Sequence, residues 1–330
     1  MRCLALAQDW NTQRGNAVFA VGSIPEGLDS RLRSEGMSVT EIASPLGTEE
    51  DATELIAAAR QLGAERIVLD GYHFGARYQQ TVKEADLRAL FIDDYGHAEY
   101  YFTDLILNQN LYADEGMYRR RNLTTQLLLG TRYALLRREF LSWSNWSRPT
   151  PAVARRLLVT LGGSDPHNTT CKVIRSLWDV NVPDLEVKIL LGPANRHQGA
   201  VRQASGQAPW RFEILTPQVD MAGMMAWADL AITAAGTTCW EMAYMGLPTV
   251  TVELAENQRR IAQSLAEAGI SFNAGWHSDL DLGHLTETIA RLVTSADERA
   301  ELSRRGRAIV DGFGARRVAQ ILVGADAGVC

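Results

Sequence analysis

The sequence of 330 residues lacks several features that would assign it to a special class of protein. No apolar run approaches the roughly 20 residues of a membrane-spanning helix, and the N-terminus lacks the charged and apolar regions of a signal peptide. The four cysteines are scattered without metal-ligand spacing, which favours buried thiols over disulfides or metal ligands. We therefore expect a cytoplasmic protein with no stable membrane association.

The chain also lacks an excess of positive charge. Its 33 Lys and Arg residues against 39 Asp and Glu residues give a net charge of -6. Nucleic acids and anionic membranes usually require a positive field, so neither is an expected partner. Apolar residues make up 46% of the chain, enough for full cores in two domains of about 150 residues each.

Short apolar runs alternate with amphipathic stretches in both halves of the chain, a pattern typical of parallel sheets covered by helices on both faces. The clearest helix spans 49–61, and the chain from 282 onward also reads as helical. The expected strands are 17–21, 38–42, 66–69, 90–92, 104–107, 156–161, 186–191, 211–215, 230–233 and 248–252. The prediction is an α/β protein of two similar open sheets, with its site beyond the carboxyl ends of the strands, in the cleft between the sheets.

The segment 142–155, rich in Ser, Trp and Pro, interrupts this alternation. It predicts a linker between an N-terminal domain, 1–141, and a C-terminal domain, 156–330. Residues 1–8 read as a helix, whereas a doubly wound domain usually opens with a central strand. The first strand of the N-terminal domain is therefore expected to be absent.

A glycine-rich turn follows the strand 156–161. Gly162 and Gly163 precede Asn168 and Thr169, which are good N-caps for a following helix. Glycines let backbone N–H groups approach an anion closely, and a helix N-terminus adds free donors and partial positive charge, so a pyrophosphate would fit there. A tight turn that only connects two elements is an equally good interpretation.

A second strand, turn and helix unit begins about 70 residues later. Ala235 and Gly236 leave room for a phosphate against the backbone, and Thr237 or Thr238 is placed to cap a helix. Glu241 falls in the first turn of that helix, where a carboxylate accepts both hydroxyls of a ribose or simply complements the helix dipole. Nothing in these residues selects uracil over another base.

These units and several further segments together resemble a known superfamily. The other segments are Met1-Arg2-Cys3-Leu4-Ala5-Leu6-Ala7-Gln8, Val68-Leu69-Asp70-Gly71-Tyr72, Ile92-Asp93-Asp94-Tyr95-Gly96, Leu105-Ile106-Leu107-Asn108-Gln109-Asn110, 130–140 and Glu256-Asn257-Gln258. The C-terminal half resembles the nucleotide half of GT-B glycosyltransferases, in particular the enzyme that adds N-acetylglucosamine to the peptidoglycan lipid precursor. Nearly the whole chain is similar to the UDP-sugar hydrolases of pseudaminic acid synthesis, which release 2,4-diacetamido-2,4,6-trideoxy-β-L-altrose from its UDP conjugate.

The resemblance implies a fold and a set of roles. It implies two Rossmann-like domains facing a cleft, a UDP-sugar substrate, and substrate contacts at Tyr72 and Asn257. It assigns the diphosphate to Gly162 and Gly163, and the nucleotide to Glu241 and its turn. Each residue also has an interpretation without a ligand. On residue type alone, Tyr72 is consistent with an aromatic residue at a strand end whose hydroxyl is solvated, and Asn257 with a helix N-cap.

The resemblance also implies a mechanism. In the hydrolase family a Gly-x-Gly-His turn supplies the general base, and by alignment that histidine would fall two residues before Met1, so the chain as written is expected to be nearly inactive. Water would attack the anomeric carbon, and UDP would leave with C–O cleavage and inversion. No metal and no cofactor is expected, because helix N-termini and backbone N–H groups can stabilise the leaving diphosphate.

Several other residues follow predicted strand ends. Asp93 and Asp94 are adjacent, so their side chains should point opposite ways and act as supporting residues rather than as a catalytic pair. Either His73 or His97 could titrate near neutral pH, although loop histidines are common on protein surfaces. Two alternatives to the hydrolase remain open: a glycosyltransferase with a UDP-sugar donor, and a nucleotide-sugar-binding protein with impaired catalysis.

Overall fold

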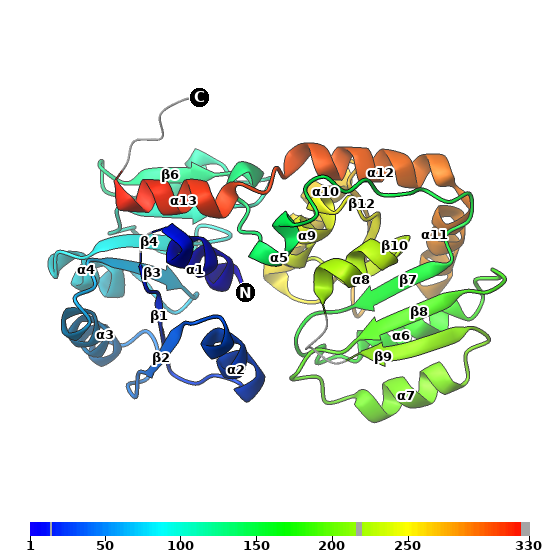
Figure 1. Cartoon of the computed structure of the whole chain (residues 1–330), viewed down its shortest axis with the longest axis horizontal. Helices are drawn as coiled ribbons and strands as arrows, with labels where there is room; N and C mark the ends of the chain where they lie inside the picture. Colours follow the sequence, from blue (N-terminus) through cyan, green and yellow to red (C-terminus); the bar gives the residue numbers. More distant parts are fainter. Residues whose placement is uncertain (14, 216–219, 325–330) are drawn as a thin grey trace. The chain divides into compact units, whose positions relative to one another are not determined.

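The computed structural model describes residues 1–13, 15–215 and 220–324, which form two compact units. Unit 1 comprises Met1–Arg138 together with the described residues from Gly312 onward, and unit 2 comprises Glu139–Asp311. Each unit is an α/β assembly of parallel strands and covering helices (Figure 1).

The described part of unit 1 contains six strands, and every expected strand of the N-terminal half is present. Its elements are α1 (Arg2–Gln13), β1 (Val18–Val21), α2 (Glu26–Ser34), β2 (Ser38–Glu41), α3 (Glu49–Gln61), β3 (Arg66–Asp70), α4 (Ala76–Glu84), β4 (Arg88–Ile92), β5 (Leu105–Asn108), η1 (Glu115–Tyr118), β6 (Gln126–Leu129), η2 (Thr131–Tyr133) and α13 (Gly314–Val323). Strand β6 was not predicted.

Helix α3 has the predicted bounds because its sequence carries both a start signal and a periodic apolar face. The Thr48 side chain accepts a hydrogen bond from Asp51 N, and three acidic residues in the first turn complement the helix dipole. Ala52, Ile56 and Ala59 are buried on one face of the helix. The helix therefore docks by this face against the sheet of unit 1.

The parallel strands of unit 1 form two separate sheets. One has the order β3-β4-β5-β6, and the other is the pair β1-β2. In the doubly wound order the first strand lies between two such halves. Within the described residues no strand joins β1 to β3.

Helix α13 corrects the predicted domain boundary. The predicted C-terminal domain ran from 156 to 330, whereas α13 belongs to unit 1 and its apolar face packs with that of α1. Arg88 and Arg66 donate to the last carbonyls of α13, those of Ile321 and Leu322. A Cβ on Gly314 would lie 2.1 Å from a backbone oxygen of unit 1, so the helix starts with a residue that permits close approach.

Unit 2 is built around one six-stranded parallel sheet, with the order β12-β11-β10-β7-β8-β9. The elements are α5 (Arg138–Leu141), which spans the boundary, β7 (Arg156–Thr160), α6 (Thr169–Leu177), β8 (Glu186–Leu190), α7 (Gln198–Gly206), β9 (Arg211–Leu215), α8 (Met221–Trp227), β10 (Leu230–Ala234), α9 (Thr238–Tyr244), β11 (Thr249–Glu253), α10 (Glu256–Glu267), β12 (Ser271–Trp276), α11 (Leu282–Thr294) and α12 (Ala296–Ile309). All five expected strands are present, and β12 was not predicted.

The predicted linker, 142–155, packs on unit 2. Trp143 and Trp146 contact the apolar cluster that contains Phe140 and residues of α8 and α9. The Arg148 guanidinium donates to three backbone carbonyls, including that of Met245 at 3.1 Å. Burial lowers the pKa of Arg148 to about 10, and the segment is therefore an integral layer of this unit.

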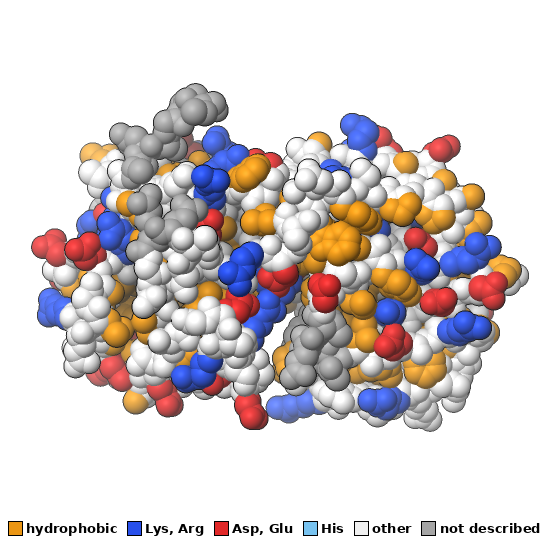
Figure 2. Space-filling model, viewed as in Figure 1, with side chains coloured by type: hydrophobic (Ala, Val, Ile, Leu, Met, Phe, Trp, Pro, Cys, Tyr) orange, Lys and Arg blue, Asp and Glu red, His pale blue; other side chains and the backbone are white. Residues whose placement is uncertain are grey.

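The surface carries mixed charge. On the face drawn in Figure 2, basic and acidic side chains are interspersed, with no extended single-sign patch. Within the described ranges, no helix is long and apolar enough to cross a bilayer.

Candidate nucleotide and acid–base sites

The two predicted glycine turns lie side by side in unit 2. Strands β7 and β10 are parallel neighbours, with Thr160 paired to Thr233, so the turns that follow them leave the same edge of the sheet. Strand β11 pairs with β10 on its other side and leads into α10. The structure therefore brings together Gly162, Gly236 and Asn257, which are far apart in the sequence.

Both turns are open at their glycines. A Cβ on Gly162, Gly163 or Gly236 would meet no atom within 4 Å. Gly162 has φ of +79°, which favours glycine. Behind the first turn, Gly192 approaches so closely that a Cβ there would lie 2.2 Å from Gly163 O. One side of the first glycine turn is thus in close contact with Gly192, and its other side is exposed.

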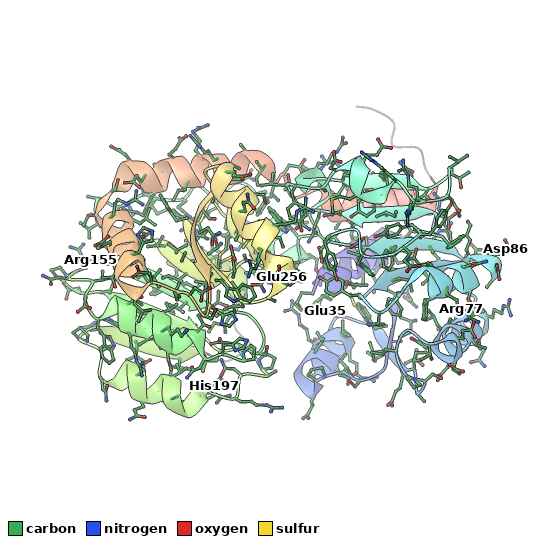
Figure 3. All side chains as sticks on the ribbon, turned by 180° about the vertical axis from the view of Figure 1, so that it is seen from behind. Glu35, Arg77, Asp86, Arg155, His197 and Glu256 are labelled. Carbon is green, nitrogen blue, oxygen red and sulfur yellow. The ribbon has the colours of Figure 1, made fainter. Side chains whose placement is uncertain are left out.

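The loop beyond the first turn is tied to α7. His197, labelled in Figure 3, lies at the start of α7, and its Nε2 is 3.1 Å from the Pro166 carbonyl oxygen. His167 in this loop stacks on His277 with ring centroids 3.9 Å apart. Burial lowers the pKa of His277, and the neighbouring His167 and Lys172 lower it further, so His277 favours the neutral form. This stacked pair was not predicted, because the two histidines meet only through the packing of α6 on α11.

The predicted donors at the N-terminus of α6 are already occupied. Asp165 Oδ1 accepts from Thr169 N at 2.8 Å, and Asp165 Oδ2 accepts from Thr170 N at 2.9 Å. Asn168 holds the cap position in the left-handed region and its side chain makes no capping bond. The prediction of free helix donors for a pyrophosphate is therefore wrong at these two amides, because the Asp165 carboxylate already neutralises this helix end.

The second turn has a similar internal arrangement. Ala235 is fully buried and its N–H donates to Val252 O, while the Gly236 N–H donates to Ala234 O. Ala235 therefore leaves room for a ligand but does not present a donor to it. Thr237 is exposed and occupies the N-cap position of α9, one of the two positions predicted for the cap, but its side chain makes no capping hydrogen bond.

Glu241 lies in the first turn of α9, as predicted, and is 7% exposed. The helix offers a positive dipole end next to this carboxylate. Cys239, in the same turn, is fully buried, and burial raises the pKa of its thiol to about 12. Cys239 is thus a packing residue rather than a nucleophile.

Asn257 is not a helix N-cap. Helix α10 is capped at Ala255 and begins at Glu256, labelled in Figure 3, so Asn257 lies in the first turn and is half-buried. Gln258 Oε1 accepts a hydrogen bond from Leu254 N at 2.9 Å, which links the first turn of α10 to the residue before its cap. The interpretation of Asn257 as a helix N-cap is therefore wrong. Asn257 follows the carboxyl end of β11, just as the two glycine turns follow the carboxyl ends of β7 and β10.

In unit 1, strand ends carry a buried charged cluster. Arg2 on α1 donates through Nε and Nη2 to Asp70, the last residue of β3, and through Nη1 to Asp94 at 2.8 Å. Asp94 also accepts from Asn110 Nδ2 at 3.1 Å and from the Tyr72 hydroxyl at 2.7 Å. The predicted substrate residue Tyr72 is 42% exposed, and its ring is fixed by this cluster.

Asp93 and Asp94 serve different networks, as expected from their alternation. Asp93 is fully buried, lies 3.3 Å from His97 Nδ1 through Oδ1, and accepts from the Tyr101 hydroxyl through Oδ2. Burial acts to raise the pKa of Asp93, but hydrogen bonds from His97 and Tyr101 outweigh it and lower the pKa. The carboxylate is therefore ionised at neutral pH.

No group of three or more His, Cys, Asp or Glu residues that could hold a metal ion occurs in the described part of the chain. Asp279 and Asp281 have the Asp-x-Asp spacing of metal-dependent glycosyltransferases. However, Asp281 Oδ1 accepts from His284 N at the start of α11, and Asp279 Oδ1 accepts from Ser278 at 3.0 Å.

The C-terminal half matches a known family. Residues 157–313 match the family model of the Glycosyltransferase family 28 C-terminal domain. This range, a little under half of the chain, contains both glycine turns, Glu241 and Asn257.

Several curated bacterial proteins are similar to the chain. The chain is 28% identical over 242 residues to the spore coat polysaccharide biosynthesis protein SpsG of Bacillus subtilis, covering 72% of this chain and 70% of SpsG. It is 24% identical over 210 residues to the pseudaminic acid cytidylyltransferase and UDP-2,4-diacetamido-2,4,6-trideoxy-beta-L-altropyranose hydrolase of Helicobacter pylori, covering 63% and 37%. It is 34% identical over 114 residues to the UDP-N-acetylglucosamine--N-acetylmuramyl-(pentapeptide) pyrophosphoryl-undecaprenol N-acetylglucosamine transferase of Shewanella oneidensis, covering 32% and 30%.

Solved structures resemble the chain along almost its full length. Acinetobacter baumannii MurG has a TM-score of 0.67 at 16% identity, covering 98% of this chain and 95% of that one. The S. aureus MnaA structure with UDP has a TM-score of 0.70 at 12% identity, covering 98% and 94%. The fold is thus of the GT-B type, with two Rossmann-like domains. With the family match and the relatives, the chain is an enzyme of the glycosyltransferase-like kind.

Proposed function

We propose that the chain hydrolyses a UDP-linked 2,4-diacetamido-2,4,6-trideoxyhexose to the free sugar and UDP, in the biosynthesis of a pseudaminic-acid-type sugar. The observation that carries the proposal is the edge of the unit 2 sheet, where two open glycine turns and Asn257 follow three adjacent strands. Ligands of parallel sheets bind at such carboxyl ends. The Helicobacter pylori relative, whose name includes this hydrolase activity, supports the sugar class.

In this proposal the residues of unit 2 hold the nucleotide. The diphosphate approaches the exposed backbone of Gly162 and Gly163, where no side chain obstructs it. Glu241 accepts the ribose hydroxyls, because a carboxylate provides only acceptors to a diol. The proposal puts the diphosphate at the glycine backbone rather than at Thr169 and Thr170, because Asp165 already accepts from the amides of those two residues.

Tyr72 and Asn257 contact the sugar in this proposal. The Tyr72 ring is exposed and its hydroxyl is held by Asp94, so it offers a fixed aromatic face for a sugar to pack on. The half-buried Asn257 amide supplies both donors and acceptors, which suits acetamido and hydroxyl groups.

UDP release measured in water enriched in oxygen-18 tests the hydrolase proposal. Hydrolysis with C–O cleavage puts the heavy oxygen into the sugar and none into UDP, and the first sugar formed has the inverted anomeric configuration by NMR. Heavy oxygen in UDP, or retention of configuration, contradicts the proposed mechanism.

A glycosyltransferase with a UDP-sugar donor is the second candidate function. It is favoured by the 34% identity to the Shewanella oneidensis transferase over 114 residues. A transferase would release UDP much faster with a sugar acceptor present than in water alone. UDP binding without release under either condition would instead support a nucleotide-sugar-binding protein.

A further inference from the structure

The loop that follows β8, residues 191–197, is fastened to the first glycine turn of unit 2. Ala194 N donates to Gly163 O at 3.0 Å. His197, labelled in Figure 3, fixes the other end of the loop, because its Nε2 lies 3.1 Å from the Pro166 carbonyl oxygen, which only accepts hydrogen bonds. The loops after β7 and β8 are therefore held together at the carboxyl edge of the sheet.

Arg196 lies between these two contacts. Its backbone is fixed on both sides, since the buried Asn195 accepts from His197 N through Oδ1 at 2.7 Å. The length of chain between Ala194 and Arg196 places the Arg196 Cα within about 12 Å of Gly163 O. A diphosphate on the exposed face of the turn is within reach of an arginine side chain at that distance.

The Arg196 side chain is exposed and has no hydrogen bond or ion pair to the residues that the structure describes. The other Lys and Arg residues near the turn are engaged or distant. Lys172 on α6 donates to a backbone carbonyl oxygen at 2.7 Å, and Arg175 lies in the last turn of that helix, away from the glycines. At the start of α10, Arg259 is paired with Glu256 at 3.0 Å.

A diphosphate at the first turn requires a positive partner. The N-terminus of α6 would normally attract phosphate, but the Asp165 carboxylate already accepts from the amides of Thr169 and Thr170 there. A second anion close to this carboxylate is repelled by it. A guanidinium offsets that repulsion, and its planar fork of donors matches two phosphate oxygens at once.

We propose that the Arg196 guanidinium binds the diphosphate of UDP at the first glycine turn and stabilises the charge that forms when UDP leaves. This inference rests on the proposed function. In hydrolysis the water oxygen bonds to the anomeric carbon and a water proton passes to solvent. The bond from that carbon to the β-phosphate oxygen breaks, and its electron pair stays on that oxygen. The leaving UDP therefore gains negative charge, and its attraction to Arg196 strengthens as the bond breaks.

Calorimetric titration of Arg196→Gln with UDP tests the assignment, with Arg211→Gln as the matched control. Arg211 is exposed and begins β9, so it lies at the opposite edge of the sheet from the glycine turns, while its loss changes the net charge equally. Loss of charge-assisted hydrogen bonds should weaken UDP binding by roughly 10- to 100-fold in Arg196→Gln. Arg211→Gln should bind as the wild type does, and Arg196→Lys, which lacks the planar fork, should be intermediate.

Uridine separates the diphosphate contact from contacts to the base and ribose. Its affinity should be the same for the wild type and Arg196→Gln, because uridine carries no phosphate. The affinity for UDP should also depend less on salt concentration in Arg196→Gln than in the wild type. Weakening of UDP binding by less than about threefold, or equal weakening of uridine and UDP, overturns the assignment.

Turnover has a separate readout. At saturating UDP-2,4-diacetamido-2,4,6-trideoxy-β-L-altrose, kcat should fall about tenfold or more in Arg196→Gln, and an unchanged kcat overturns the role in UDP departure. If the wild type binds UDP but releases none from this substrate, the proposed hydrolysis fails, while the titrations still decide whether Arg196 binds the diphosphate. If the wild type binds no UDP up to millimolar concentration, the assignment of Arg196 is overturned as well.

Discussion

Arg2→Met should destabilise unit 1 more than most single substitutions. Arg2 donates to both carboxylates of Asp70 and Asp94, and the side chains are 10%, 25% and 8% exposed, respectively. Removing one partner of a buried ion pair costs about 3–5 kcal/mol, because the remaining charges are left uncompensated. Asp70 is partly solvated, so a loss of about 3 kcal/mol is expected.

Hydrogen exchange followed by mass spectrometry measures this loss in unit 1 directly. At 1.36 kcal/mol per tenfold, about 3 kcal/mol corresponds to roughly 150-fold faster exchange of the protected amides in β3 and β4. Peptides from β7 and β10 of unit 2 serve as the internal reference, because they should exchange as in the wild type.

Two further variants separate charge from packing. Combining Arg2→Met with Asp70→Asn and Asp94→Asn removes the uncompensated carboxylates and should restore most of the protection. Arg2→Lys keeps the charge but loses the planar fork, so its protection should be intermediate. Exchange in Arg2→Met within about threefold of wild type would refute the reasoning, since the carboxylates would then be solvated without their partner.

Three other predictions concern stability. Gly192→Ala places a Cβ 2.2 and 2.4 Å from the carbonyl oxygens of the glycine turn and should lower the free energy of unfolding by about 1–3 kcal/mol in urea titrations, whereas Gly199→Ala, in open space, should be nearly neutral. Arg299→Met leaves three backbone carbonyls without their buried donor, and a loss of about 1–3 kcal/mol should appear as a lower urea midpoint; an unchanged midpoint would contradict it. Burial acts to raise the pKa of Asp70, but Arg2 lowers it overall, so the unfolded chain takes up this proton at a higher pH than the folded one. Stability is therefore present above about pH 4 and is lost as the pH falls through the depressed value, and Arg2→Met should weaken that pH dependence in urea titrations between pH 6 and 3.

Local patterns predicted most of the sheets. The bounds of α3 follow from its cap and its apolar face, and the ten predicted strands are all present. Strand β12 was missed because Asn273 and Gly275 interrupt its apolar pattern, and its pairing with β11 provides what the local sequence does not. The assignment of α13 to unit 1 depends on packing against α1, and the local sequence of α13 contains no sign of that contact.

The sequence predicted where the candidate site lies on the sheet. It predicted less well which backbone amides are free to bind a ligand. The order of strands brings Gly162 and Gly236 to one edge of the sheet, as the strand and turn pattern indicates. Residue type predicted a cap at Asn168 or Thr169. The structure has Asn168 at the cap position without a side-chain bond, and the Asp165 carboxylate accepts from the amides of Thr169 and Thr170 instead, a contact set by the conformation of the loop. His97 has its partner four residues earlier in the sequence, but only the buried Asp93 side chain shows that the two interact.

Titration calorimetry with UDP tests the central claim most directly. The account predicts saturable binding of one UDP per chain. Gly163→Leu and Glu241→Gln should each weaken it by roughly 10- to 100-fold, because the leucine side chain blocks the approach of the diphosphate to the backbone and the glutamine lacks the charged acceptor for the ribose hydroxyls. Gly206→Leu, which adds the same side chain in open space at the opposite end of α7 from His197, should bind as the wild type does. No heat of binding up to millimolar UDP, or equal weakening by all three variants, would contradict the nucleotide site proposed for unit 2.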